Sequence, residues 1–152
     1  MKSNSILLLK DYKGFFGSKQ NSPIYRGGMD IQKLVDLFSI EGFETKSVMI
    51  SNIDYSQIMQ VQPIILYTSS EDRKNLYKSY IEDIILHLEE MGLTVIPKFL
   101  YLRAHNNKIA MELLRNRSGI SSIQTIHSTT FGALEELILH GKDFNFPVVI
   151  KR

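Results

Sequence analysis

The chain has 152 residues, the size of one ordinary domain, and 43% of them are hydrophobic and 22% charged. Its formal net charge of +2 is too small to favour nucleic acid or an anionic membrane as a partner. Cysteine is absent, which excludes disulfides, thiolate metal ligands and a cysteine nucleophile. This composition is compatible with the cytoplasmic location that we expect.

Strands and helices are predicted to alternate over the first hundred residues. The apolar run Ile6–Leu9, closed by Lys10 and Asp11, is too short to span a membrane and suits a buried strand. Capping residues and glycines mark where the helices begin and end. We expect strands at residues 6–9, 45–50, 64–67 and 93–96, and helices between Asp30 and Gly42 and between Asp72 and Gly92.

This alternation predicts an α/β fold, a Rossmann-like parallel sheet flanked by helices with right-handed crossovers. Ligands of such sheets bind at the carboxyl ends of the strands. Here those ends are the segments Lys10–Tyr12, Tyr67–Ser70 and Pro97–Lys98.

The last third of the chain reads as the start of a second unit. A helix is predicted at 107–117 and ends at Gly119, and a short strand is predicted at 121–126. A further helix, capped by Thr129 or Thr130, leads to the apolar strand Phe146–Ile150 and Lys151. We therefore expect two domains, residues 1–103 and an incomplete one at 104–152.

The glycine-rich loop from Gly14 to Gly28 follows the first predicted strand. It matches neither Gly-x-Gly-x-x-Gly nor the phosphate loop Gly-x-x-x-x-Gly-Lys-Ser/Thr, which counts against a Rossmann-type dinucleotide enzyme. Its glycines suit turns. The functional alternative is a loop that contacts substrate through Tyr25 and Arg26.

Other polar residues give no catalytic or metal-binding pattern. The four histidines lack the spacing of metal ligands, so we expect no metal site within this chain. The acidic pairs Glu89-Glu90 and Glu135-Glu136 are interpreted as solvated helix faces. His87 and His140 are expected to be solvent-facing or boundary residues.

Lys108 and Lys151 lie within a series of short motifs that resembles a known family. Each alone would be interpreted as a surface charge, although Lys108 opposes the dipole of the helix that it opens. The order Asn107-Lys108, Met111–Leu114, Gly119-Ile120, Leu134–Glu136 and Phe146–Lys151 resembles the entry to an ATP-grasp fold. The alternating sheet before it resembles the domain that precedes ATP-grasp in these ligases.

The resemblance implies an ATP-dependent carboxylate–amine or carboxylate–thiol ligase that works through an acyl phosphate. Lys151 would contact the ATP phosphates, and Lys108 would line the nucleotide site. Asn107 stands where an acid is commoner, and Ser121 where a proline is usual. The family's glycine-rich flap, second strand lysine, adenine hinge and Mg²⁺ ligands would lie beyond Arg152. We therefore expect the chain alone to be inactive, with no catalytic residue of its own and weak nucleotide affinity.

A second hypothesis is a free-standing, non-catalytic α/β binding or interaction module. The closing strand would then pair within the chain or with a second copy, as in a homodimer. The ligase hypothesis instead implies small-molecule carboxylate and amine substrates, together with ATP and Mg²⁺.

Overall fold

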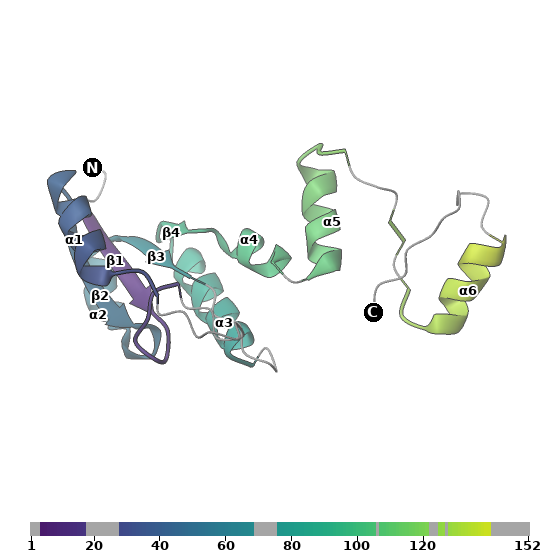
Figure 1. Ribbon diagram of the computed structural model, residues 1–152, viewed down its shortest axis with the longest axis horizontal. Coiled ribbons are helices and arrows are strands. Elements are labelled where there is room, and N and C mark those ends of the chain that lie inside the picture. The colour runs from purple at the N-terminus through teal and green to yellow at the C-terminus, as the bar shows by residue number, and fades with distance from the viewer. Residues whose placement is uncertain are drawn as a thin grey trace. The chain divides into compact units, whose positions relative to one another are not determined.

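The computed structural model describes residues 4–17, 28–68, 76–105, 107–121, 125–126 and 128–140 (Figure 1). The chain divides into two compact units, which we call the first unit (Met1–Asn106) and the second unit (Asn107–Arg152). Within the described residues, none of the helices has the length and apolar character needed to cross a membrane.

A four-stranded parallel sheet in the order β2-β1-β3-β4 forms the centre of the first unit. β1 pairs with β2 on one side and with β3 on the other, so that Leu8 lies beside both Ser47 and Leu66. This architecture confirms the predicted Rossmann-like α/β class. The strands are β1 (Ser5–Lys10), β2 (Glu44–Met49), β3 (Ile64–Tyr67) and β4 (Val95–Ile96).

Helices cover both faces of the sheet. The expected cap of the first helix is confirmed, because the Asp30 carboxylate accepts a hydrogen bond from the Lys33 amide. Asp54 caps α2 in the same way through the Gln57 amide. The elements are α1 (Ile31–Ile40), a 3₁₀ turn at Ile50–Asn52, α2 (Tyr55–Val61), α3 (Leu76–Glu90) and α4 (Phe99–Ala104).

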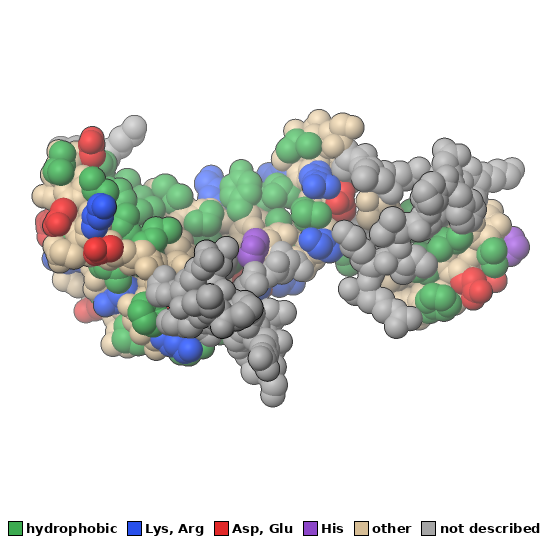
Figure 2. Space-filling view, viewed as in Figure 1, with side chains coloured by type: hydrophobic (Ala, Val, Ile, Leu, Met, Phe, Trp, Pro, Cys, Tyr) green, Lys and Arg blue, Asp and Glu red, His purple; other side chains and the backbone are tan. Residues whose placement is uncertain are grey.

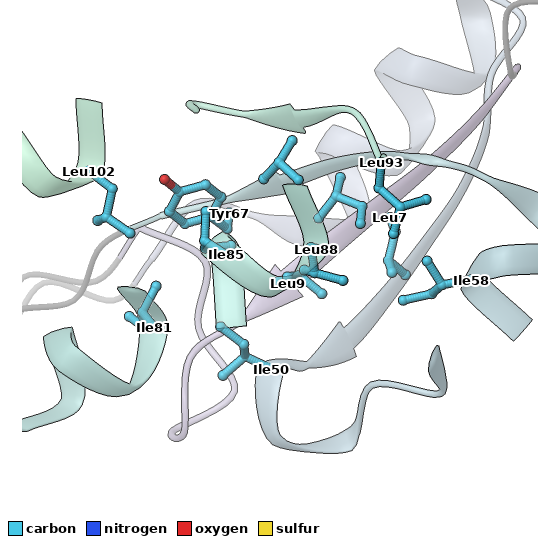
Figure 3. Close-up of a cluster of buried hydrophobic side chains, with 12 residues drawn as sticks. Leu7, Leu9, Ile50, Ile58, Tyr67, Ile81, Ile85, Leu88, Leu93 and Leu102 are labelled. Carbon is cyan, nitrogen blue, oxygen red and sulfur yellow. The ribbon is translucent and has the colours of Figure 1, made fainter. Parts of the chain in front are cut away.

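Alternate residues of β1 enter two separate cores, as the two-residue period of a strand requires. Leu7 and Leu9 join the larger cluster, with residues of α2, α3 and α4 (Figure 3). Ile6 and Leu8 join a smaller cluster with Phe16, against which residues of α1 pack. The continuous apolar run of β1 is therefore explained by burial on both faces.

One side of α3 packs into the larger core cluster. Ile81, Ile85 and Leu88 are its fully buried residues, whereas Tyr80 is 40% exposed. Two helices, α2 and α4, were not expected at all. The described residues of the predicted strand at 121–126, which are 121, 125 and 126, are not in a strand.

The second unit contains the two expected helices, α5 (Lys108–Arg117) and α6 (Phe131–His140). Hydrophobic side chains lie at the surface of both helices (Figure 2). Leu113 of α5 is 60% exposed and Phe131 of α6 is 63% exposed. The described helices of this unit therefore expose apolar side chains of the kind that helices usually bury.

Buried charges join α3 to α4. Lys78 and Glu82 are both buried on α3, with 3.6 Å between the lysine Nζ and the carboxylate Oε1. The other oxygen of Glu82 lies 2.6 Å from an Arg103 guanidinium nitrogen. Lys78 also donates to the backbone carbonyl of His105, just before the second unit. Such a network holds the end of α4 because each buried charge has a partner.

The Glu82→Gln variant should be destabilised by about 3 kcal/mol, because buried Lys78 then faces a neutral amide. Asp83→Asn, an exposed carboxylate change on the same helix, should shift the free energy of unfolding by about 0.5 kcal/mol or less. Chemical denaturation of the two variants checks this. Equal stability of both would contradict the role given to the buried network.

Candidate functional site

The structure describes only one of the four residues predicted to bind ligands. Lys108 is the first residue of α5. Lys151, Tyr25 and Arg26 lie outside the described residues, so their predicted roles stay predictions.

The start of α5 is well defined. Asn107 caps the helix, because its side-chain oxygen accepts a hydrogen bond from the Ala110 amide at 3.0 Å. Lys108 is exposed, and among the described residues it has no salt-bridge partner. An exposed ammonium beside the positive end of a helix suits a phosphate ligand, because the amides and the charge favour anions together.

A second polar region lies at the carboxyl edge of the sheet, where β1 ends. The carboxylate of Asp11 is buried, and one of its oxygens accepts hydrogen bonds from the Lys13 and Phe15 amides, both at 2.9 Å. The Asp11 amide in turn donates to the Phe15 carbonyl at 2.7 Å. This turn needs the positive φ of 82° at Gly14. Asp11 therefore fixes the loop that leaves β1.

Contacts with other segments hold the same loop in place. The Gly17 amide donates to the Thr68 hydroxyl at 2.7 Å, which attaches the loop to the end of β3. The Met29 amide donates to the Phe16 carbonyl, also at 2.7 Å. A Cβ added to Gly28 would lie 2.4 Å from the Phe16 carbonyl oxygen, so only glycine allows this approach. The predicted loop thus has its described ends pinned at the carboxyl edge.

α3 also contacts this loop, through a tyrosine hydroxyl. The Tyr77 hydroxyl accepts a hydrogen bond from the Tyr12 amide at 3.0 Å. Burial raises the pKa of the Tyr77 phenol well above its usual value, and the nearby Asp11 carboxylate raises that pKa further. The phenol therefore stays neutral across the physiological range.

Tyr67, the last residue of β3, carries a buried hydroxyl that has no hydrogen-bond partner among the described residues. Figure 3 shows this hydroxyl directed toward the segment that carries Leu102. Burial, followed by the charges of Glu89 and Glu82, raises the pKa of the Tyr67 phenol. No chemistry follows from this neutral hydroxyl alone.

A cavity of about 90 Å³ lies away from this edge, between α2 and the first half of β1. Leu7, Val48 and Ile58 line it, together with polar residues such as Lys46. Sites for drug-sized ligands have volumes of about 300–1,000 Å³, so this cavity is too small for a nucleotide.

Two expectations about acidic and histidine side chains can be compared with the structure. Glu89 is not simply part of a solvated face, because its carboxylate accepts the Phe99 amide at 2.6 Å and holds the start of α4. His87 is exposed and its ring lies against Tyr55, as expected for a boundary residue. Among the described residues, no three histidine or acidic side chains form a group able to hold a metal ion.

One curated protein shows similarity to part of this chain. It is the "UPF0597 protein" of Alkaliphilus oremlandii (strain OhILAs), 35% identical over 99 residues. The similarity covers 61% of this chain and 23% of the relative, whose name specifies no activity. No family model matches the chain, and no solved structure matches it.

The Asp11→Ala variant should be less stable by about 1–3 kcal/mol for each amide left without an acceptor. Asp11→Asn should lose less, because the amide oxygen can still accept from Lys13 and Phe15. Hydrogen exchange of those two amides, with chemical denaturation, measures the effect. If Asn and Ala destabilise equally, hydrogen bonding by the side-chain oxygen is not what holds the loop.

Proposed function

We propose that this chain is the amino-terminal portion of an ATP-dependent carboxylate–amine or carboxylate–thiol ligase of the ATP-grasp type. A parallel α/β unit is followed by a helix that opens with Asn107-Lys108. The placement of Lys108, exposed at the capped start of α5, is the observation that carries the proposal. It leaves the ammonium accessible to a phosphate group.

The uncovered apolar side chains of the second unit support the same proposal. Ile109 and Leu113 lie one turn apart on α5, and both are exposed. On α6, Phe131 and Leu139 are exposed as well. Helices gain most of their stability by burying such residues, so further chain that completes an ATP-binding lobe would account for them.

In the proposed reaction, a substrate carboxylate oxygen attacks the γ-phosphorus of ATP and ADP leaves. The amine or thiol then attacks the acyl phosphate and inorganic phosphate leaves. Such phosphoryl transfer depends on positioning and on neutralising charge, which is the part assigned to Lys108 and, by resemblance, Lys151. Mg²⁺ would supply further charge neutralisation, with ligands outside this chain.

We expect Lys108→Ala to weaken ATP binding about 10- to 100-fold, because a hydrogen bond to a charged group contributes about 1.5–3 kcal/mol. Calorimetric titration of Mg-ATP into the full-length protein that contains this chain measures the loss. Lys33→Ala is the matched control, since Lys33 is an exposed lysine in the first turn of another capped ten-residue helix.

Unchanged ATP affinity in Lys108→Ala would remove the basis of the proposal. Absence of ATP binding in the parent protein would favour the alternative, a non-catalytic α/β binding or interaction module.

A further inference from the structure

Three tyrosines from two segments meet at the carboxyl edge of the sheet, and we call Tyr12, Tyr77 and Tyr80 the tyrosine shelf. The rings of Tyr12 and Tyr77 meet edge to face, with 4.6 Å between their centroids. The rings of Tyr77 and Tyr80 are stacked, with centroids 6.1 Å apart and 29° between their planes. Both separations lie in the range of favourable aromatic pairs.

The middle ring of the shelf is fixed by the fold. Tyr77 is partly buried against the larger core cluster, and its hydroxyl holds the Tyr12 amide. Tyr12 directly follows Asp11, whose carboxylate fixes the loop. The Tyr77 ring and the backbone of Tyr12 are therefore held in place before a ligand arrives, which lowers the entropic cost of binding.

The outer rings remain open to solvent. Tyr12 is 43% exposed and Tyr80 is 40% exposed, although the core of the first unit is close by. Exposed aromatic rings that flank a fixed third ring offer flat apolar surface to a ligand. Their position at the carboxyl edge of a parallel sheet is where ligands of this fold class bind.

A positive charge adjoins the shelf. The Nζ of Lys13 lies 5.7 Å from the centroid of the Tyr12 ring. The neighbouring carboxylate of Asp11 is buried and engaged by backbone amides, so it offers little charge to solvent. A ligand that stacks on the shelf would thus meet an ammonium group beside it, which favours a ligand with an anionic group.

We propose that the tyrosine shelf binds an aromatic carboxylate, with its ring on Tyr12 and Tyr80 and its carboxylate toward Lys13. Aromatic stacking suits the exposed rings, and the Lys13 ammonium suits a carboxylate. One step rests on the proposed ligase function, namely that this ligand is the carboxylate substrate that the ligase activates. The binding itself requires no nucleotide.

The probe is 3-phenylpropionate, titrated into the 152-residue chain without ATP. Chemical shift changes should be largest at the amides of Tyr12 and Tyr77 to Tyr80. Two matched compounds separate the contributions to binding: 3-cyclohexylpropionate keeps the charge without the aromatic ring, and 3-phenylpropanol keeps the ring without the charge. We expect each to bind more weakly than 3-phenylpropionate.

Matched variants test the residues. Tyr80→Leu and Lys13→Gln should each raise the dissociation constant of 3-phenylpropionate, on the order of tenfold for the ring. Tyr101→Leu and Lys46→Gln are the controls, because both residues are exposed and lie outside the shelf. The controls should bind like the parent, and circular dichroism should show that all four variants are folded.

Equal affinity for 3-phenylpropionate and 3-cyclohexylpropionate would overturn the proposal, and so would equal losses in Tyr80→Leu and Tyr101→Leu. Absence of saturable binding to the folded parent would overturn it as well. A failure here leaves the ATP measurement on Lys108 unaffected. A failure of ATP binding likewise leaves the shelf measurement unaffected, so the two proposals can be judged separately.

Discussion

The first unit depends on the burial of β1 on every side. This strand pairs with β2 and β3 along its two edges, and its side chains alternate between two cores. Four consecutive apolar residues, Ile6 to Leu9, are buried. The strand therefore exposes no polar side chain along this stretch before it ends. Because all four strands are parallel, their ends gather at one edge. The candidate ligand surfaces of the first unit follow from that geometry.

Several polar groups at the ends of the elements form hydrogen bonds that hold neighbouring segments. Asp11 satisfies two loop amides, Thr68 another, and Glu89 the amide that opens α4. Buried polar groups without partners are costly, so each pairing fixes a segment that would otherwise be free. The Lys78–Glu82–Arg103 network acts in the same way on the last helix before Asn107. Rigid placement of polar side chains at the edge is the result.

Strongly patterned elements could be predicted from the sequence, and those stabilised by distant contacts could not. Apolar runs, capping residues and glycines in the sequence predict the strands and α1. Among the described residues of α2, only Ile58 is buried, so its periodic signal is weak. α4 begins at an amide held by Glu89, ten residues earlier in the chain, and no local pattern shows that contact.

The candidate site was predictable to a similar extent. Lys108 at the head of a capped helix was visible in the sequence, because Asn107 is a good cap and Gly119 a good stop. The tyrosine shelf was not, since Tyr12 and Tyr77 are 65 residues apart and only the parallel pairing of β1 with β3 brings their segments together. The sequence does carry a signal: Tyr12 follows the end of β1, and Tyr77 lies in the first turn of α3, the helix that follows β3.

The central proposal is that a nucleotide binds beside Lys108, at the start of α5 in the second unit. A lysine-reactive acyl phosphate derivative of ATP, followed by peptide mass spectrometry, tests this directly in the full-length protein. We predict that labelling concentrates on Lys108 and Lys151 and is suppressed by unmodified ATP. Labelling spread over the exposed lysines of the first unit, or labelling that excess ATP does not suppress, would contradict nucleotide binding beside Lys108.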